Sequence, residues 1–248
     1  MKKKEQVQEP TVEIQPIEYE TQAIEETANV LFKPNPGPQT DFLAAAEREV
    51  LYGGSAGGGK SYAMLSDPLR YMGHPAFSGL LLRHTTEELR ELVFKSQELY
   101  PKIWPGIKWS ERKMQWTAPS GARLWMSYLD RDDDVLRYQG LAFSWIGFDE
   151  LTQWASPYAW NYMRSRLRST APDLPIYMRA TTNPGGRGHH WVKKMFIDPA
   201  PYNRAYDATD IETGEVLRYP AGHAKAGRPL YKRRFIPARL SDNPYLAE

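Results

Sequence analysis

The 248-residue sequence contains no cysteine and no run of about 18 or more apolar residues. Without cysteine the chain forms no disulfide bond and no thiolate zinc site, which fits a reducing compartment. Without a long apolar run it offers no membrane-spanning helix, so we expect no membrane partner. The amino-terminal stretch MKKKEQVQEP is basic but has no apolar segment behind it. It is therefore not expected to act as a secretory signal.

Net charge is small, at +2, but it is unevenly distributed. Residues 1–30 hold three lysines and seven glutamates and carry a local charge of −4, so the rest of the chain carries +6. Residues 218–239 contain seven lysine or arginine residues and no acidic one. Such a stretch could follow a nucleic-acid backbone, and a solvated basic face of a strand or turn is an equally good interpretation.

The first 37 residues are rich in glutamate, glutamine, proline and threonine and show no clear periodicity. They run into the segment KPNPGP at residues 33–38. Prolines at this density favour extended, helix-free chain. We therefore expect residues 1–37 to be a tail, disordered or wrapped over the surface, and residues 38–248 to form one folded domain.

Strands and helices are expected to alternate through that domain. Apolar runs predict strands over 49–52, 79–83, 142–148, 175–180 and 233–236, and helical spacing predicts helices over 60–71, 86–99 and 156–169. Residues 113–117 and 122–128 flank Ser120-Gly121 and predict a β-hairpin, and a second hairpin-like stretch surrounds Thr213-Gly214. This order predicts an α/β fold with a mainly parallel central sheet flanked by helices and a β-hairpin insertion.

Two unrelated catalytic motifs overlap in EVLYGGSAGGGKSYAM, residues 49–64. Residues 53–57 fit G-x-S-x-G, the turn that presents a nucleophilic serine in α/β-hydrolases. Residues 54–61 fit G-x-x-x-x-G-K-[ST], the loop that binds nucleotide phosphates. A hydrolase also needs an earlier strand-to-helix loop for its oxyanion hole, and only about a dozen foldable residues precede the first strand. The phosphate-binding loop is therefore the favoured interpretation.

In that loop, glycines allow successive backbone N–H groups to converge on phosphate oxygens, and the following helix adds its positive end. Lys60 would reach the β- and γ-phosphates of ATP, and Ser61 would hold Mg²⁺. The nucleotide-binding candidates are Gly54, Ser55, Ala56, Gly57, Gly58, Gly59, Lys60 and Ser61.

A second signal is FSWIGFDE, residues 143–150, a hydrophobic strand that ends in two adjacent carboxylates. In a parallel sheet the carboxyl ends of the strands line the ligand crevice. Asp149 would therefore bind Mg²⁺ beside the phosphate loop, and Glu150 would orient and deprotonate the attacking water. Thr181, Thr182 and Asn183 follow the next strand, where short polar side chains could sense the γ-phosphate, or could simply cap a turn before Pro184.

Gln39 ahead of the first strand, GSAGGGKS, GFDE and TTNP, in that order and spacing, resemble the ATPase domain of phage terminase large subunits. The resemblance spans residues 38–248 and implies a P-loop ATPase of the additional-strand, catalytic-glutamate type. It implies that Gln39 contacts adenine and that Thr181, Thr182 and Asn183 couple hydrolysis to movement. In the family a nuclease domain follows the ATPase domain, and we expect this sequence to hold the ATPase domain alone.

The sequence departs from the family pattern at two arginine positions. Many terminases carry an arginine inside the phosphate loop, and here no positive charge occupies residues 55–58. Many also place an arginine ahead of the strand leading to the catalytic pair, where it reaches a neighbouring subunit. Gln139-Gly140 holds the nearest match here, so Arg137, Arg131 or Arg83 would have to supply that cation in trans.

The resemblance also implies partners and location. The leading hypothesis is a motor that drives double-stranded DNA into a viral procapsid, acting in the host cytoplasm as a homo-oligomeric ring with the portal protein and the terminase small subunit, and monomeric in isolation. The alternatives are a helicase-like or recombinase-like ATPase, or a nucleotide-gated docking module with little turnover. The candidates for gripping DNA phosphates are Arg164, Arg166 and Arg168, expected on one helix, and Arg228, Lys232, Arg233 and Arg234.

Overall fold

The computed structural model describes residues 32–55, 57 and 59–242. The expected tail lies outside these residues except for its last part, and the first helix begins at Pro38. Within the described residues, no helix combines the length and the apolar character needed to cross a membrane.

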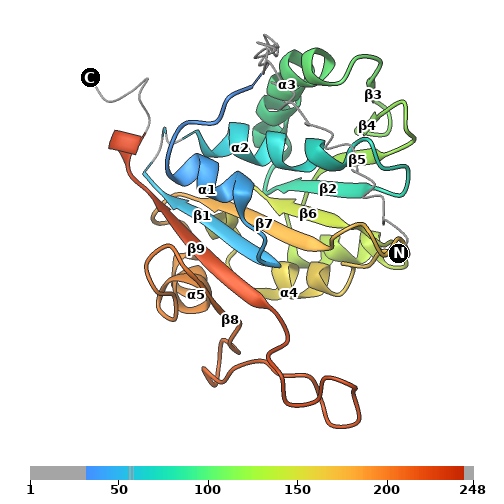
Figure 1. The fold of residues 1–248 in the computed structure, drawn as a ribbon. Coiled ribbons are helices and arrows are strands. Elements are labelled where there is room, and N and C mark those ends of the chain that lie inside the picture. The colour runs from blue at the N-terminus through green and yellow to red at the C-terminus, as the bar shows by residue number, and fades with distance from the viewer. Residues whose placement is uncertain (1–31, 56, 58, 243–248) are drawn as a thin grey trace, which may run out of the picture. The chain divides into compact units, whose positions relative to one another are not determined.

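One mixed sheet organises the chain (Figure 1). Its strands are β1 (Glu49–Gly54), β2 (Ser78–Arg83), β3 (Lys108–Ser110), β4 (Gln115–Thr117), β5 (Arg123–Tyr128), β6 (Trp145–Phe148), β7 (Tyr177–Thr182), β8 (Ala205–Asp207) and β9 (Lys232–Ala238). Their order across the sheet is β3-β4-β5-β2-β6-β7-β1-β9-β8. The central run from β5 to β9 is parallel, and β3, β4 and β8 add antiparallel pairs at the two sides.

Helices cover both faces of this sheet (Figure 1). The α-helices are α1 (Pro38–Ala44), α2 (Lys60–Ser66), α3 (Thr86–Ile103), α4 (Tyr158–Arg164) and α5 (His189–Val192). The 3₁₀ helices are η1 (Asp67–Tyr71), η2 (Asp132–Tyr138), η3 (Leu151–Gln153) and η5 (Leu240–Asp242), and η4 (Lys193–Ile197) is a π-helix. Helices α1, α2 and α3 lie on one face, and α4 and α5 lie on the other.

The run of three leucines in β2 shows why the sheet is covered on both sides. Leu81 packs in the core cluster that includes residues of α2 and α3. Leu80 and Leu82, whose side chains point the other way, pack in the cluster that includes Trp160 and Phe196. A strand buried on both faces is apolar throughout rather than alternating, as this one is. The α/β fold with a mainly parallel central sheet is therefore confirmed.

Most predicted elements are present, but two predicted helices differ in extent, and the elements that were not predicted include α1, α5, β3 and β8. The predicted helix over 60–71 is α2 followed by the 3₁₀ turn η1, which contains Pro68. The predicted helix over 156–169 ends at Arg164, because the chain then leaves the helix to pair Leu167 with Phe143. Strand β3 was not predicted, since three residues carry too little pattern, and it extends the predicted hairpin of β4 and β5.

Candidate functional site

The phosphate-loop motif lies between the carboxyl end of β1 and the start of α2, as its sequence context requires. Gly59, the residue before α2, has φ +72°, a backbone conformation that residues other than glycine adopt only under strain. A Cβ atom there would also lie 2.7 Å from the Gln39 side-chain nitrogen. Ala56 and Gly58, which were predicted as nucleotide-binding residues, lie outside the described residues.

Lys60 is folded back onto its own loop. Its side-chain Nζ donates a hydrogen bond of 2.6 Å to the backbone oxygen of Ser55, and the residue is only 6% exposed. Burial lowers the pKa of Lys60, and the carboxylates of Glu150 and Asp149 act against that shift. A buried ammonium with one carbonyl partner retains donors that phosphate oxygens could take.

Gln39, on α1, forms a hydrogen bond with the same loop. The Gln39 side chain is 4% exposed; it donates 2.9 Å to the backbone oxygen of Gly59 and accepts from the backbone N–H of Asn35. The residue predicted to contact adenine is therefore in direct contact with the phosphate loop.

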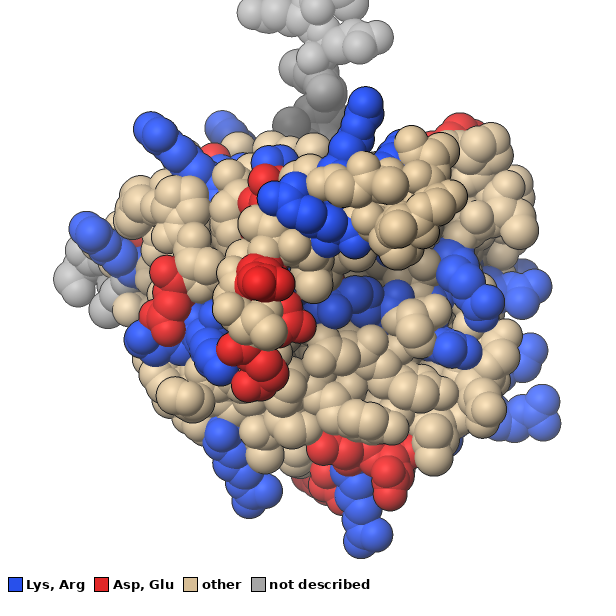
Figure 2. Space-filling view, turned by 90° about the horizontal axis from the view of Figure 1, so that it is seen from below, with Lys and Arg blue, Asp and Glu red and all other residues tan. Residues whose placement is uncertain are grey.

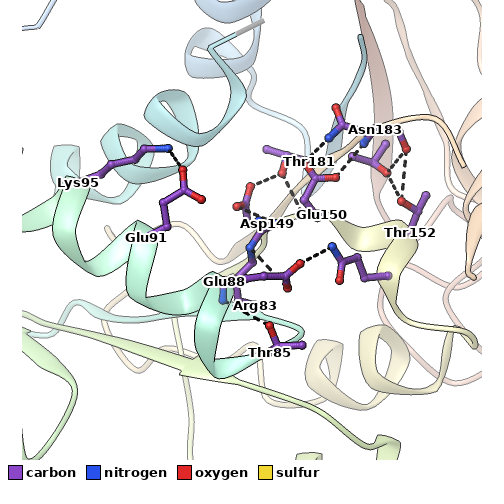
Figure 3. Close-up of polar contacts among 12 residues, drawn as sticks. Arg83, Thr85, Glu88, Glu91, Lys95, Asp149, Glu150, Thr152, Thr181 and Asn183 are labelled. Carbon is purple, nitrogen blue, oxygen red and sulfur yellow. Dashed lines mark hydrogen bonds and ion pairs between the residues drawn. The ribbon is translucent and has the colours of Figure 1, made fainter. Parts of the chain in front are cut away.

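Asp149 stands at the end of β6 and is 1% exposed. Its Oδ1 accepts a hydrogen bond from the Thr181 hydroxyl, and its Oδ2 lies 3.2 Å from Nη1 of Arg83 (Figure 3). Burial raises the pKa of Asp149, and the Arg83 charge is the main influence against that shift. Oδ2 is buried and has no hydrogen-bond donor.

Glu150 sits next to Asp149 in an uncommon backbone conformation. Its φ is +60°, in the left-handed region, which for a residue other than glycine costs on the order of 1 kcal/mol and is most often found at functional sites. Asn183 donates to both carboxylate oxygens, from its backbone N–H at 3.0 Å and its side-chain Nδ2 at 2.6 Å (Figure 3). Burial and the neighbouring Asp149 charge raise the pKa of Glu150.

Two of the predicted coupling residues, Thr181 and Asn183, contact the carboxylate pair, and Thr182 bonds Thr152 just beyond it. The Thr181 hydroxyl bonds Asp149 and also accepts from the backbone N–H of Glu150 at 3.0 Å. The Thr182 hydroxyl donates to that of Thr152 at 2.9 Å, and Thr152 donates to the backbone oxygen of Asn183 at 3.3 Å. Strand β7, which carries these residues, lies between β1 and β6.

A cavity of about 300 Å³ joins these parts. Its lining comprises Gly57, Gly59, Lys60, Ser61, Tyr62, Lys95, Glu150 and Asn183. The phosphate loop and Glu150 thus face one space. Lys95, on α3, is the residue that sequence reasoning missed; its i, i+4 spacing from Glu91 was the available signal.

The residues present fit a magnesium–nucleotide complex. Mg²⁺ prefers oxygen ligands and takes most of them from phosphates and water, needing one or two from the protein. Ser61 lines the cavity, and Asp149, the neighbour of the lining residue Glu150, has an Oδ2 that pairs with Arg83 but accepts no hydrogen bond. Among the described residues, no three acidic or histidine side chains gather into a metal site of their own, as expected where phosphates complete the shell.

The arginines expected to act in trans differ in placement. Arg83 is excluded, because its side chain is 12% exposed and its guanidinium faces Asp149 of the same chain. Arg137 is 47% exposed; it donates to the backbone oxygens of Tyr128 and Asp134 and pairs with the Asp134 carboxylate at 3.5 Å. Arg131 is exposed just ahead of η2.

Three of the predicted DNA-contacting arginines form hydrogen bonds within the fold instead of projecting freely from the surface. Arg233 is 1% exposed and donates to the Glu49 carboxylate at 2.7 Å, so its assignment to DNA is wrong. Arg164 bonds the other oxygen of Glu49, and Arg234 donates to the Asn203 side chain at 2.9 Å. The expectation that Arg164, Arg166 and Arg168 share one helix is also wrong, since α4 ends at Arg164.

The exposed members of the set are Arg168, Arg228 and Lys232, the last paired with Asp207 at 2.7 Å, and Arg166 is half-buried. On the face drawn in Figure 2, blue side chains lie at the rim and towards the middle, separated by tan surface and by red groups. That face therefore shows no continuous basic band.

The fold and the site together define a P-loop ATPase fold of the additional-strand type. The added strand is β7, which separates the phosphate-loop strand β1 from the strand β6 that ends in the carboxylate pair. The hydrolase alternative fails, because the described residues contain no strand before β1 and so no earlier strand-to-helix loop for an oxyanion hole.

Residues 51–219 match the family model described as terminase large subunit, T4likevirus-type, N-terminal. The chain belongs to this family. No curated protein matches it.

Solved structures show the same fold. The large terminase of a thermophilic bacteriophage, in complex with ATP-γ-S, is 15% identical, with a TM-score of 0.57 over 87% of this chain and 47% of that one. The large terminase ATPase domain of Thermus phage P74-26 is 12% identical, with a TM-score of 0.54 over 86% of this chain and 83% of that one. The ADP complex of the first terminase is matched at 17% identity and a TM-score of 0.51, over 67% of this chain and 42% of that one. This chain thus spans less than half of that terminase.

Proposed function

We propose that this domain hydrolyses ATP in the cavity between the phosphate loop and Glu150 and uses the energy to drive double-stranded DNA into a viral procapsid. The observation that carries the proposal is the placement of Glu150: a carboxylate with a raised pKa, held by two donors from Asn183, facing the same cavity as Lys60. Family membership and the nucleotide complexes of the similar terminase support the choice of ATP.

In this proposal the phosphates lie on the loop formed by residues 54–61. Lys60 exchanges its bond to the Ser55 oxygen for the β- and γ-phosphates, since an ammonium–phosphate bond is the stronger of the two. Mg²⁺, held by Ser61 and by Asp149 through water, would neutralise charge on the phosphate oxygens. Gln39, already in contact with Gly59, extends the site towards adenine.

Glu150 orients the attacking water and accepts its proton. Its raised pKa makes it a better base than an ordinary carboxylate. Asn183 fixes both carboxylate oxygens, and β7 carries any displacement of Asn183 and Thr181 towards the rest of the sheet. Those contacts support the coupling role of Thr181, Thr182 and Asn183.

DNA gripping is assigned to the exposed cations Arg168, Arg228 and Lys232, which can follow phosphates without reading sequence. Arg137, exposed and next to an acidic turn, is the candidate for the cation supplied to a neighbouring subunit. The proposal includes a homo-oligomeric ring assembled on the portal protein with the terminase small subunit, in the host cytoplasm, from domains that are monomeric in isolation.

The test is ATP turnover by the purified chain, with and without double-stranded DNA, beside Glu150→Gln. DNA-stimulated or concentration-dependent hydrolysis that the variant loses while still binding nucleotide is the expected result. Binding without hydrolysis at any concentration would overturn the motor and leave a nucleotide-gated docking module.

A further inference from the structure

Lys95 lines the nucleotide cavity although it belongs neither to the phosphate loop nor to either strand end. It lies in the third turn of α3, the helix that follows β2. Figure 3 shows the Lys95 and Glu91 side chains projecting from α3 on the side that faces Asp149. The Lys95 side chain is 29% exposed, so it is accessible to a ligand in the cavity.

The present partners of Lys95 hold it weakly. Its Nζ lies 2.5 Å from Oε1 of Glu91, a carboxylate that is 64% exposed, and 6.0 Å from the ring centre of Tyr62. Solvent-exposed i, i+4 ion pairs contribute only a few tenths of a kcal/mol. A phosphate oxygen can therefore take the ammonium from Glu91 at little cost.

The surroundings need such a cation. A terminal phosphate carries more charge than Lys60 neutralises, and residues 55–58 of the loop contribute no positive side chain. Among the described residues that line the cavity, the basic ones are Lys60 and Lys95.

We propose that Lys95 is a catalytic residue that binds the terminal phosphate of ATP in cis and takes the place of the absent loop arginine. The inference rests on the proposed function and deepens its site. Lys95 leaves Glu91, approaches the γ-phosphate across the cavity from Lys60, and stabilises the charge that spreads over the phosphate oxygens during transfer. After hydrolysis the cation loses this partner and returns to Glu91.

Because ADP lacks the terminal phosphate, the prediction concerns the difference between two ligands. Lys95→Met keeps an unbranched side chain close to the length of the lysine stem and removes its charge. With Mg²⁺ present, calorimetric titration should show affinity for ATP-γ-S weakened about 10- to 100-fold, the range of one hydrogen bond between charged groups, and affinity for ADP almost unchanged. The rate of ATP turnover should fall as well.

Two variants control for structural effects. Lys102→Met removes an exposed lysine at the far end of the same helix and should leave both affinities unchanged. Lys95→Arg restores a cation and should recover most of the preference for ATP-γ-S. Equal weakening of both ligands in Lys95→Met, or affinities equal to those of Lys102→Met, would overturn the assignment.

The proposed function fails in a different way from this inference. If the native chain binds both nucleotides but never hydrolyses ATP, the motor function is refuted. The affinities of Lys95→Met for ATP-γ-S and ADP still decide whether Lys95 binds the terminal phosphate. If the native chain hydrolyses ATP and the nucleotide affinities of Lys95→Met are unaffected, the motor function stands and Lys95 has no role in it.

Discussion

Glu49 offers the most quantitative test of the fold beneath the phosphate loop. This carboxylate is fully buried at the first position of β1 and bonds Arg233 of β9 and Arg164 of α4. Burial alone would raise the pKa of Glu49, but the two guanidinium groups outweigh it, so the pKa lies below its usual value. The residue therefore joins the phosphate-loop strand to its neighbour and to the helix beneath.

Glu49→Gln removes the negative charge with almost no change of shape. It leaves Arg233, which is 1% exposed, as a buried cation without its anion. Breaking a buried pair by removing one partner costs about 3–5 kcal/mol. For a domain of this size each kcal/mol lowers the melting temperature by about 2–4 °C, so the variant should melt roughly 6–20 °C below the native chain.

The assay is unfolding by urea and by heat, followed by circular dichroism at pH 7. Glu212→Gln is the matched control. The Glu212 side chain is 78% exposed, so breaking its pair with Lys194 should change the free energy of unfolding by less than about 1 kcal/mol. If Glu49→Gln proves as mild as Glu212→Gln, Glu49 does not hold Arg233, and the removal of Arg233 from the DNA-contacting set loses its basis.

Three further predictions follow from the described contacts. The pKa of Glu49 is lower in the folded chain than in the unfolded one, so its contribution to stability is complete above the unfolded value of about 4.3 and is lost as the pH falls through the folded value. The difference in unfolding free energy between the native chain and Glu49→Gln, measured by urea titration at several pH values, should therefore shrink towards acid. A constant difference would contradict this prediction. Asn183→Ala removes the 2.6 Å bond to Glu150 and should lower the maximal rate of ATP turnover about 10- to 100-fold with nucleotide affinity unchanged, whereas loss of affinity alone would show that Asn183 does not act through Glu150. Gly59→Ala places a Cβ 2.7 Å from the Gln39 amide at φ +72° and should cost about 1–2 kcal/mol and weaken nucleotide binding, measured by thermal unfolding and calorimetry; unchanged values of both would refute the described loop conformation.

The parts of the site that could be predicted from sequence are those set by local chemistry. The glycine run needs positive φ values, and two carboxylates at the end of an apolar strand need a cationic or aqueous neighbour, so both motifs are visible without a structure. The alternation of strands and helices placed them at one edge of the sheet. The resemblance to terminases added the additional strand, which the order β6-β7-β1 confirms.

The parts that could not be predicted depend on partners far away in the sequence. Arg233 belongs to a basic run that is typical of a DNA-binding surface, and only the pairing of β9 with β1 shows that it faces Glu49. Arg83 ends β2 and meets Asp149 at the end of β6 for the same reason. In both cases an arginine is neutralised by a carboxylate more than sixty positions away in the sequence.

The position of β7 supports the proposal that one strand serves both binding and movement. Because β7 lies between β1 and β6, its carboxyl end reaches the phosphate loop on one side and the carboxylate pair on the other. Thr181 bonds Asp149 and the Glu150 backbone, and Asn183 bonds the Glu150 side chain. Under the proposed function, a loss of phosphate that alters the charge balance at Asp149 and Glu150 would act first on β7, which runs parallel to both strands and is buried throughout. A rigid, buried strand would not absorb that change locally, so the displacement would pass to the rest of the sheet and to the loop that follows Asn183.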